Sequence, residues 1–329
     1  HFIENCPLHH FGRIDRTYTP AVLLSGVGNR IVHNLMHDAP SSVMRIEGND
    51  HLIEFNEAYN AVTESDDQGA VDMWGNPAYR GNIFRYNYFH HIGKTGDEPF
   101  AWGQAGLRVD DVISGQVIYG NIFAHCSRGF FGGVQINAGR DNIIDNNIFY
   151  ACNIGVSGGW YATNAIWQGI KNGTHYLAKN DYHNTPLYLS RYPEIKNMLD
   201  DHGCNYLWRN LFYACGEMLS KSSNRQTFDL MANAEFATGE DPGFAGGLAP
   251  FVASGTGFAT GAAAPGTPSR LPAGLFRLRP DAPLFTRIAF RPLPVEEIGL
   301  YEHELLACDC AHAAGAGAIS SGDRQEQGE

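Results

Sequence analysis

Acidic side chains gather in one stretch of this sequence. Asp66, Asp67 and Asp72 border a first glycine-led apolar segment, and Asp110 and Asp111 follow a second one. Two carboxyl groups can hydrolyse a glycosidic bond, because one protonates the leaving oxygen while the other attacks the anomeric carbon or activates water. We therefore take these aspartates as the candidate chemical groups.

Other chemistries remain compatible with the same residues. Clustered carboxylates also suit calcium, which polysaccharide lyases use to neutralise a uronate carboxylate. A lyase needs a base beside the acids, and Arg108 stands two residues before Asp110. His90 and His91 follow a repeat asparagine and are candidates to face the same cleft, or are ordinary surface histidines. The sequence contains no G-x-S-x-G elbow, phosphate loop or zinc signature, so no cofactor is expected, and calcium is the alternative.

Composition narrows the class of partner. The net charge of −12 argues against nucleic acid or an anionic membrane as the binding partner. No run of eighteen apolar residues is present, so no membrane span is expected. We expect a monomer that acts on carbohydrate. Because the chain starts in mid-pattern at His1, we also expect that residues upstream of it are missing.

A repeated unit must position the aspartates. Six segments share an apolar residue, an asparagine three positions later, and a further apolar residue two positions after that, as in RIVHNLMHDA and VIYGNIFAHC. Repeats of twenty-odd residues built from short β-runs indicate a solenoid of stacked strands, in which each asparagine hydrogen-bonds the next. The pattern predicts an all-β, right-handed parallel β-helix. The six asparagines are Asn34, Asn56, Asn87, Asn121, Asn147 and Asn210.

Other columns of the repeat predict the interior. Phe89, Phe123, Phe149 and Phe212 should form one buried column. Cys126, Cys152 and Cys215 fill a second column, which we interpret as free thiols that pack as small hydrophobic groups.

A third strand precedes each asparagine unit, and strand alternation predicts its outward side chains. Arg108 and Gln135 should lie in one outward column with Arg45, and Asp110 in the next with Glu47 and Asn137. Matching Gly69 with Gly106 turns Asp72 inward and separates Asp67 from Asp110 by about 20 Å. Asp67 is nevertheless kept as the partner of Asp110 because of the family resemblance described below, and Asp72 is held in reserve as its substitute in the pair.

The repeat also sets the expected boundaries. Rungs should occupy residues 1–215, with an insertion at 160–203 that carries Trp160 among several aromatic residues. These aromatics could stack on sugar or form a small core of their own. Residues 216–305 should cap the coil or fold back along it, and residues 306–329 are expected to be a disordered tail.

Several segments, among them NRIVHNLMHDAP, YRGNIFRYNYFHHIG and GQAGLRVDDVISGQVIYGNIF, resemble bacterial β-helix proteins related to glycoside hydrolase family 141. The likeness covers about residues 1–215 and 275–303. It implies a fucosidase- or xylanase-type hydrolase whose acids match Asp67, Asp110 and Asp111. Arg108, Gln135, Asp72, His90, His91 and Trp160 are then substrate-binding candidates, and a secreted or periplasmic location follows from the substrate class. The alternatives are a calcium-assisted lyase and a non-catalytic glycan-binding module.

Overall fold

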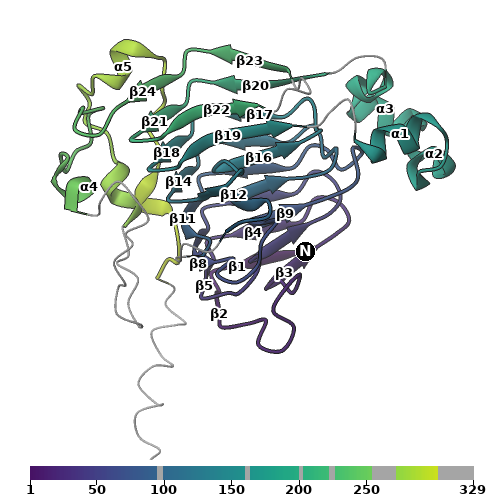
Figure 1. Ribbon diagram of the computed structural model, residues 1–329, viewed down its shortest axis with the longest axis horizontal. Helices are drawn as coiled ribbons and strands as arrows, with labels where there is room; N and C mark the ends of the chain where they lie inside the picture. The colour runs from purple at the N-terminus through teal and green to yellow at the C-terminus, as the bar shows by residue number, and fades with distance from the viewer. Residues whose placement is uncertain (95–98, 160–163, 200–202, 222–226, 254–271, 303–329) are drawn as a thin grey trace, which may run out of the picture.

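The computed structural model describes residues 1–94, 99–159, 164–199, 203–221, 227–253 and 272–302. The chain winds into a right-handed parallel β-helix, as the repeat predicts, and its rungs stack along one axis (Figure 1). Each rung adds one strand to each of three sheets, which we call sheets A, B and C. Within the described part, no helix has the length and apolar character that crossing a membrane requires.

Sheets A and B follow each other directly along the chain. Sheet A contains β1 (Phe2–Glu4), β4 (Arg30–Val32), β7 (Leu52–Glu54), β10 (Ile83–Arg85), β13 (Val117–Tyr119), β17 (Ile143–Asp145), β20 (Cys204–Trp208) and β23 (Thr227–Met231). Sheet B contains β2 (Pro7–His9), β5 (Leu35–His37), β8 (Glu57–Ala61), β11 (Tyr88–Ile92), β14 (Ile122–Ala124), β18 (Ile148–Tyr150), β21 (Leu211–Tyr213) and β24 (Ala234–Phe236).

Sheet C carries the aspartate-rich segments. Its strands are β3 (Val22–Leu24), β6 (Met44–Ile46), β9 (Gln68–Met73), β12 (Gly103–Val109), β16 (Val134–Asn137), β19 (Ile154–Gly159) and β22 (Glu217–Lys221), with β15 (Ser127–Gly129) antiparallel to β12. Strands β22, β23 and β24 lie beyond the boundary expected at residue 215. That boundary is therefore too early, because the last rung lacks the full apolar pattern but still pairs with the rung before it.

The asparagine ladder lies at the buried turn between sheets A and B. The Nδ2 of Asn121 donates to Oδ1 of Asn147 at 3.0 Å, and all six predicted asparagines are joined in this way. Asn233 extends the ladder by one rung. A second ladder, which the sequence did not reveal, runs through the turn that enters sheet A. Its members are Asn29, His51, Asn82, Gln116, Asn142 and Asn205.

The interior of the coil is apolar, as predicted. Phe123 stacks on Phe89 and on Phe149 with ring centroids 5.4 and 5.1 Å apart, and Phe149 stacks on Phe212 at 4.8 Å. Cys126 and Cys152 are buried free thiols beside this column. Repeating side chains of one size in one column lets each rung fill its own cross-section without voids.

The insertion lies to one side of the coil (Figure 1). It forms α1 (Ala165–Lys171), α2 (Tyr176–Asn180), η1 (Tyr182–Asn184), α3 (Pro186–Arg191) and η2 (Pro193–Asn197). Trp167 is buried in a small core of the insertion and donates to the carbonyl of Ala138 at 2.7 Å. Buried Arg80 joins the insertion to the rungs through Glu194 and Asp141. At Trp167, therefore, the aromatic side chain builds the insertion and does not face solvent.

The C-terminal segment folds back along sheet B (Figure 1). It contains α4 (Ala249–Ala253), η3 (Ala273–Phe276), α5 (Leu284–Arg287) and η4 (Val295–Glu297). Its aromatic and aliphatic side chains form a second core with the outward residues of sheet B. The expected tail at 306–329 lies outside the described residues.

Candidate functional site

The strand register of sheet C determines which side chains face outward. Arg108 pairs with Asp72 on β9 and with Gln135 on β16, and Asp72 pairs in turn with Arg45 on β6. These four side chains therefore form one outward column. The prediction that Asp72 points inward is wrong, since Gly69 pairs with Ala105 and a shift of one residue reverses every side chain of a strand.

Arg108 is the centre of the acidic cluster. Its guanidinium donates to Asp67 at 2.8 Å and to Asp72 at 3.2 Å, and it also forms an ion pair with Asp110. Burial favours a lower pKa for Arg108, but the carboxylates of Asp110, Asp72 and Asp67 outweigh it and raise the pKa. Arg108 therefore stays charged and partly neutralises the three acids.

Asp67 and Asp110 are close together, and the separation of about 20 Å expected from the sequence is wrong. Both carboxylates contact the same nitrogen, Nη2 of Arg108. Two hydrogen bonds to one donor atom place the acceptor oxygens within about 6 Å of each other. The sequence estimate assumed extended chain, whereas a loop before β9 turns Asp67 back toward Arg108.

The loop that presents Asp67 is held by Asp66. The carboxylate of Asp66 accepts from the backbone of Asp67 at 2.7 Å, of Ala101 at 2.7 Å and of Gly103 at 2.8 Å. Asp67 itself has a φ of +59°, a conformation that aspartate tolerates better than most residues. Asp66 thus fixes the position of Asp67 through backbone contacts.

Asp110 directly follows β12 and is almost fully buried, with 3% of its surface exposed. Its Oδ1 accepts from Nδ2 of Asn137 at 2.9 Å. Burial is the main cause that raises the pKa of Asp110 to about 7, and the charges of Asp111 and Asp72 add to it. Burial also raises the pKa values of Asp67 and Asp72. A carboxyl group that stays protonated near neutral pH can act as a general acid.

Asp111 lies at the rim and is fixed by three donors. It accepts from the indole of Trp74 at 2.8 Å, from Asn164 at 2.8 Å and from Asn137 at 3.2 Å. Asn164 caps α1, so Asp111 also connects the insertion to sheet C. With both oxygens engaged, Asp111 is better placed to hold Trp74 than to react.

These side chains surround an open pocket of about 370 Å³. Trp74, half exposed, forms one wall, and the guanidinium of Arg45 lies 5.9 Å from its ring centroid. Sequence reasoning missed Trp74, although it directly follows the strand that carries Asp72. The lining residues are Tyr18, Arg45, Asp67, Asp72, Trp74, Arg108, Asp110 and Asp111.

Other predicted site residues lie elsewhere. His90 and His91 belong to β11 of sheet B, and neither lines this pocket. His90 is buried, stacks on Tyr59 and contacts Glu57 at 3.2 Å, while burial lowers the pKa of His91 to about 3. Their expected place at the cleft is therefore wrong. Gln135 lines a neighbouring pocket, and Trp160 lies outside the described residues.

The side chains of the acidic cluster also bear on the calcium alternative. Among the residues that the structure describes, no group of three His, Cys, Asp or Glu side chains has the arrangement of a metal site. The guanidinium of Arg108 lies between the carboxylates of Asp67, Asp72 and Asp110. It therefore occupies the position that a metal ion bound by all three would need. The donor set therefore does not fit calcium.

Comparison with known protein families agrees with the architecture. The family model described as the right-handed β-helix region matches residues 20–184, half of the chain. The chain belongs to this family. Comparison with curated proteins gives no match. Right-handed β-helix regions are compatible with carbohydrate-active and glycan-binding proteins alike, so the activity must be argued from the residues of this pocket.

Proposed function

We propose that the protein is a glycoside hydrolase in which Asp110 and Asp67 are the catalytic pair. The observation that carries the proposal is that both carboxyl groups contact one guanidinium nitrogen at an open pocket, while the pKa of Asp110 is raised to about 7. Two close carboxyl groups with different environments are what acid-assisted glycosidic cleavage requires.

The roles follow from burial and contacts. Protonated Asp110 gives its proton to the glycosidic oxygen as the bond to the anomeric carbon breaks. Asp67, which is more exposed and faces Arg108, attacks that carbon as the carboxylate. Asp110 then removes a proton from water, whose oxygen displaces Asp67 and releases the sugar. One water molecule is consumed for each bond cleaved.

The spacing of the pair favours retention of anomeric configuration. A separation within about 6 Å is closer to the roughly 5–5.5 Å of retaining enzymes than to the roughly 6.5–9.5 Å of inverting ones. The first sugar has Trp74 beside it, whose exposed ring can pack on an apolar sugar face. The likeness to glycoside hydrolase family 141 makes fucosides and xylosides the first substrates to test, and a polysaccharide substrate suits a secreted or periplasmic protein.

A lyase is less well supported. It would need a neutral base beside the acids, and Arg108 has a raised pKa and three carboxylate partners. Its guanidinium therefore holds its proton throughout the range in which proteins are folded.

Hydrolysis of a panel of aryl fucosides, xylosides and other aryl glycosides tests the proposal. We expect turnover of at least one of them, and a loss of about 10²–10⁴-fold for Asp110→Asn, since that variant cannot donate a proton. Asp67→Asn should be similarly impaired. Glu217→Gln, on β22 of the same sheet and outside the acidic pocket, is a matched control that should keep its activity.

Two results would contradict the proposal. One is full turnover by Asp110→Asn on a glycoside that the parent protein cleaves. The other is absorbance of an unsaturated uronate in place of released reducing sugar, which would identify a lyase. Proton magnetic resonance of the first product formed distinguishes retention from inversion.

A further inference from the structure

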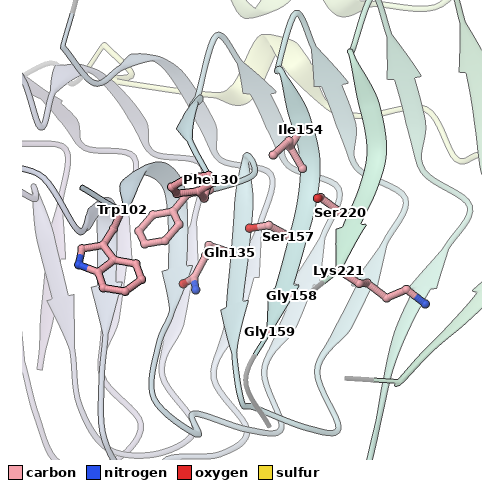
Figure 2. A pocket seen from close by; sticks show the side chains of 10 residues that line it. Trp102, Phe130, Gln135, Ile154, Ser157, Gly158, Gly159, Ser220 and Lys221 are labelled. Atoms are coloured by element: carbon pink, nitrogen blue, oxygen red, sulfur yellow. The ribbon is translucent and has the colours of Figure 1, made fainter. Parts of the chain in front are cut away.

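A second pocket of about 280 Å³ opens on the outer face of sheet C, farther along the helix axis (Figure 2). It is lined by Trp102, Phe130, Phe131, Gln135, Ile154, Ser157, Gly158, Gly159, Ser220 and Lys221. The acidic pocket does not include these residues. The second pocket is therefore a separate surface feature with its own chemistry.

The two pockets lie on one outward column of sheet C. Arg108 pairs with Gln135, and Gln135 pairs with Ser157. Neighbouring strands are about 4.8 Å apart, so Gln135 lies one rung from the acid cluster. Phe131 joins the pockets, because it lines the second one while the guanidinium of Arg108 lies 5.7 Å from its ring centroid. A chain-like ligand that follows the column would reach both.

Gln135 provides an unused acceptor at the base of the second pocket. The residue is 5% exposed, and in the described part of the protein its Oε1 has no hydrogen-bond partner. Figure 2 shows the amide directed into the space beside Trp102. A buried carbonyl oxygen without a donor costs free energy, so a donor supplied by a ligand would be favourable there.

Two aromatic side chains, Trp102 and Phe130, form the walls of the second pocket beside the Gln135 amide. The rings of Trp102 and Phe130 are 46% and 69% exposed, and both stand beside Gln135 in Figure 2. Gly159, which pairs with Asn137, also lines the pocket and has no side chain to fill it. The charged group of Lys221 points away from Trp102 in Figure 2. The ligand should therefore have an apolar face, hydroxyl donors and no required charge.

We propose that this pocket is a subsite for a neutral pyranose ring of the same glycan whose bond is cleaved at the acidic pocket. The inference rests on the proposed function, and it adds that the substrate is an oligosaccharide or polysaccharide that extends along the helix axis. One ring face packs on Trp102 and Phe130, and a hydroxyl group donates to Oε1 of Gln135. The Trp102 loop is held by the same Asp66 carboxylate that positions Asp67.

The first test compares Trp102→Ala with the parent protein. The probes are the aryl glycoside that the parent cleaves and hexasaccharides of xylose, glucose, mannose and galacturonate, titrated by calorimetry. Trp102→Ala should weaken binding of a neutral hexasaccharide roughly tenfold or more, because aromatic anchors dominate such contacts. The loss should be larger for the hexasaccharide than for cleavage of the short aryl glycoside, which does not reach this pocket. Phe2→Ala, which removes an exposed ring from sheet A, is the matched control and should match the parent in both assays.

The second test uses Gln135→Leu, which keeps the side-chain volume and removes the unused oxygen. This variant should bind the neutral hexasaccharide more weakly, yet its melting temperature should be equal to or above that of the parent. A purely structural role for Gln135 predicts the reverse, with lower stability and unchanged binding.

The outcomes separate this inference from the proposed function. Binding of a neutral hexasaccharide that depends on Trp102 and Gln135, without hydrolysis of any glycoside, would support the subsite and contradict the hydrolase. Asp110-dependent hydrolysis with no effect of either substitution on any hexasaccharide would overturn the subsite alone. Binding confined to the galacturonate oligomer would also overturn it, because the pocket would then recognise a carboxylate, with Lys221 as its cation, and not a neutral ring.

Discussion

Sheets B and C belong to one coil and share its interior, yet their outer faces are opposites. From β11 onward, sheet B has apolar outward residues such as Tyr88, Ile122 and Ile148, and the C-terminal segment covers them. The corresponding column of sheet C contains Arg45, Asp72, Arg108, Gln135 and Ser157 and is open at two pockets. The same β-helix rung can therefore support either a second core or a binding surface, and its outward side chains decide which.

The largest effect should come from breaking the cover of sheet B. Phe251 is buried against Tyr150, Tyr213 and Phe276. Phe251→Ala should lower the free energy of unfolding by about 3–5 kcal/mol, because it leaves a cavity in the second core. The matched change on sheet C is Leu23→Ala, which alters an outward and exposed side chain and should cost less than about 0.5 kcal/mol.

Denaturant titration measures both variants. Equal losses for the two substitutions would mean that the faces do not differ in the way described. Activity per folded molecule should be unchanged in Phe251→Ala, since its contacts lie on sheet B and not at the acidic pocket.

A smaller loss of stability is expected from substitutions in the hydrogen-bonded ladders, which do not distinguish sheet B from sheet C. Asn121→Ala removes bonds to Asn147 and Phe84 and leaves buried groups of Asn87 without their acceptor. We expect a loss of about 2–3 kcal/mol. Asn233→Ala, at the less buried end of the same ladder, should cost clearly less, and thermal unfolding of both variants checks the difference. A greater loss at Asn233 would contradict the view that burial sets the value of each ladder bond.

The smallest expected effect is the change of kcat/KM with pH, which depends on the charged groups of sheet C. Since the pKa of Asp110 is raised from 3.8 to about 7, the acid form persists to neutral pH and is lost above it. The kcat/KM should fall about tenfold per pH unit above that value, equivalent to about 1.4 kcal/mol. The pKa of Asp110 is higher in the folded protein than in the unfolded chain. Protonated Asp110 therefore contributes folding stability at low pH, and this contribution is lost as the pH rises through about 7.

Asp72→Asn sharpens this test. Removing the charge of Asp72 should move the alkaline limb of the pH profile to lower pH, because that charge helps to raise the pKa of Asp110. Asp145→Asn, on sheet A, should leave the limb in place. A limb that is the same in all three proteins would show that Asp110 is not the group that titrates.

The fold could be predicted because its determinants recur. Asn121 and Asn147 occupy equivalent positions in successive rungs, so one interaction explains six residues of the sequence. The second ladder was missed because histidine, glutamine and asparagine alternate there, as at His51, Asn82 and Gln116. Because three residue types make the same hydrogen bond, the equivalent positions do not share one residue type that the repeat analysis could detect.

The acidic site could be predicted only in part, because it depends on the register of two unequal strands. The strand alignment placed Arg108 on the outward face, but Asp67 was paired with Asp110 only through the family resemblance. Matching Gly69 with Gly106 predicted the wrong orientation for Asp72. In the structure Gly69 pairs with Ala105, inside a strand longer than the apolar pattern indicates. Loops such as the one fixed by Asp66 carry no periodic signal, and their shape depends on contacts between distant residues.

The C-terminal return segment also has a consequence for how the coil comes apart. Asn5 and Tyr301 exchange two hydrogen bonds of 3.0 Å, and the amide of Gly299 donates to the carbonyl of Phe55 at 2.8 Å. A linear solenoid frays from its ends, because each end rung has a single neighbour. Here the rungs that contain Asn5 and Phe55 are fastened to a segment that also packs on β24, so separating rungs at either place must break long-range contacts. The chain should therefore unfold as one cooperative unit and withstand proteases that attack frayed ends.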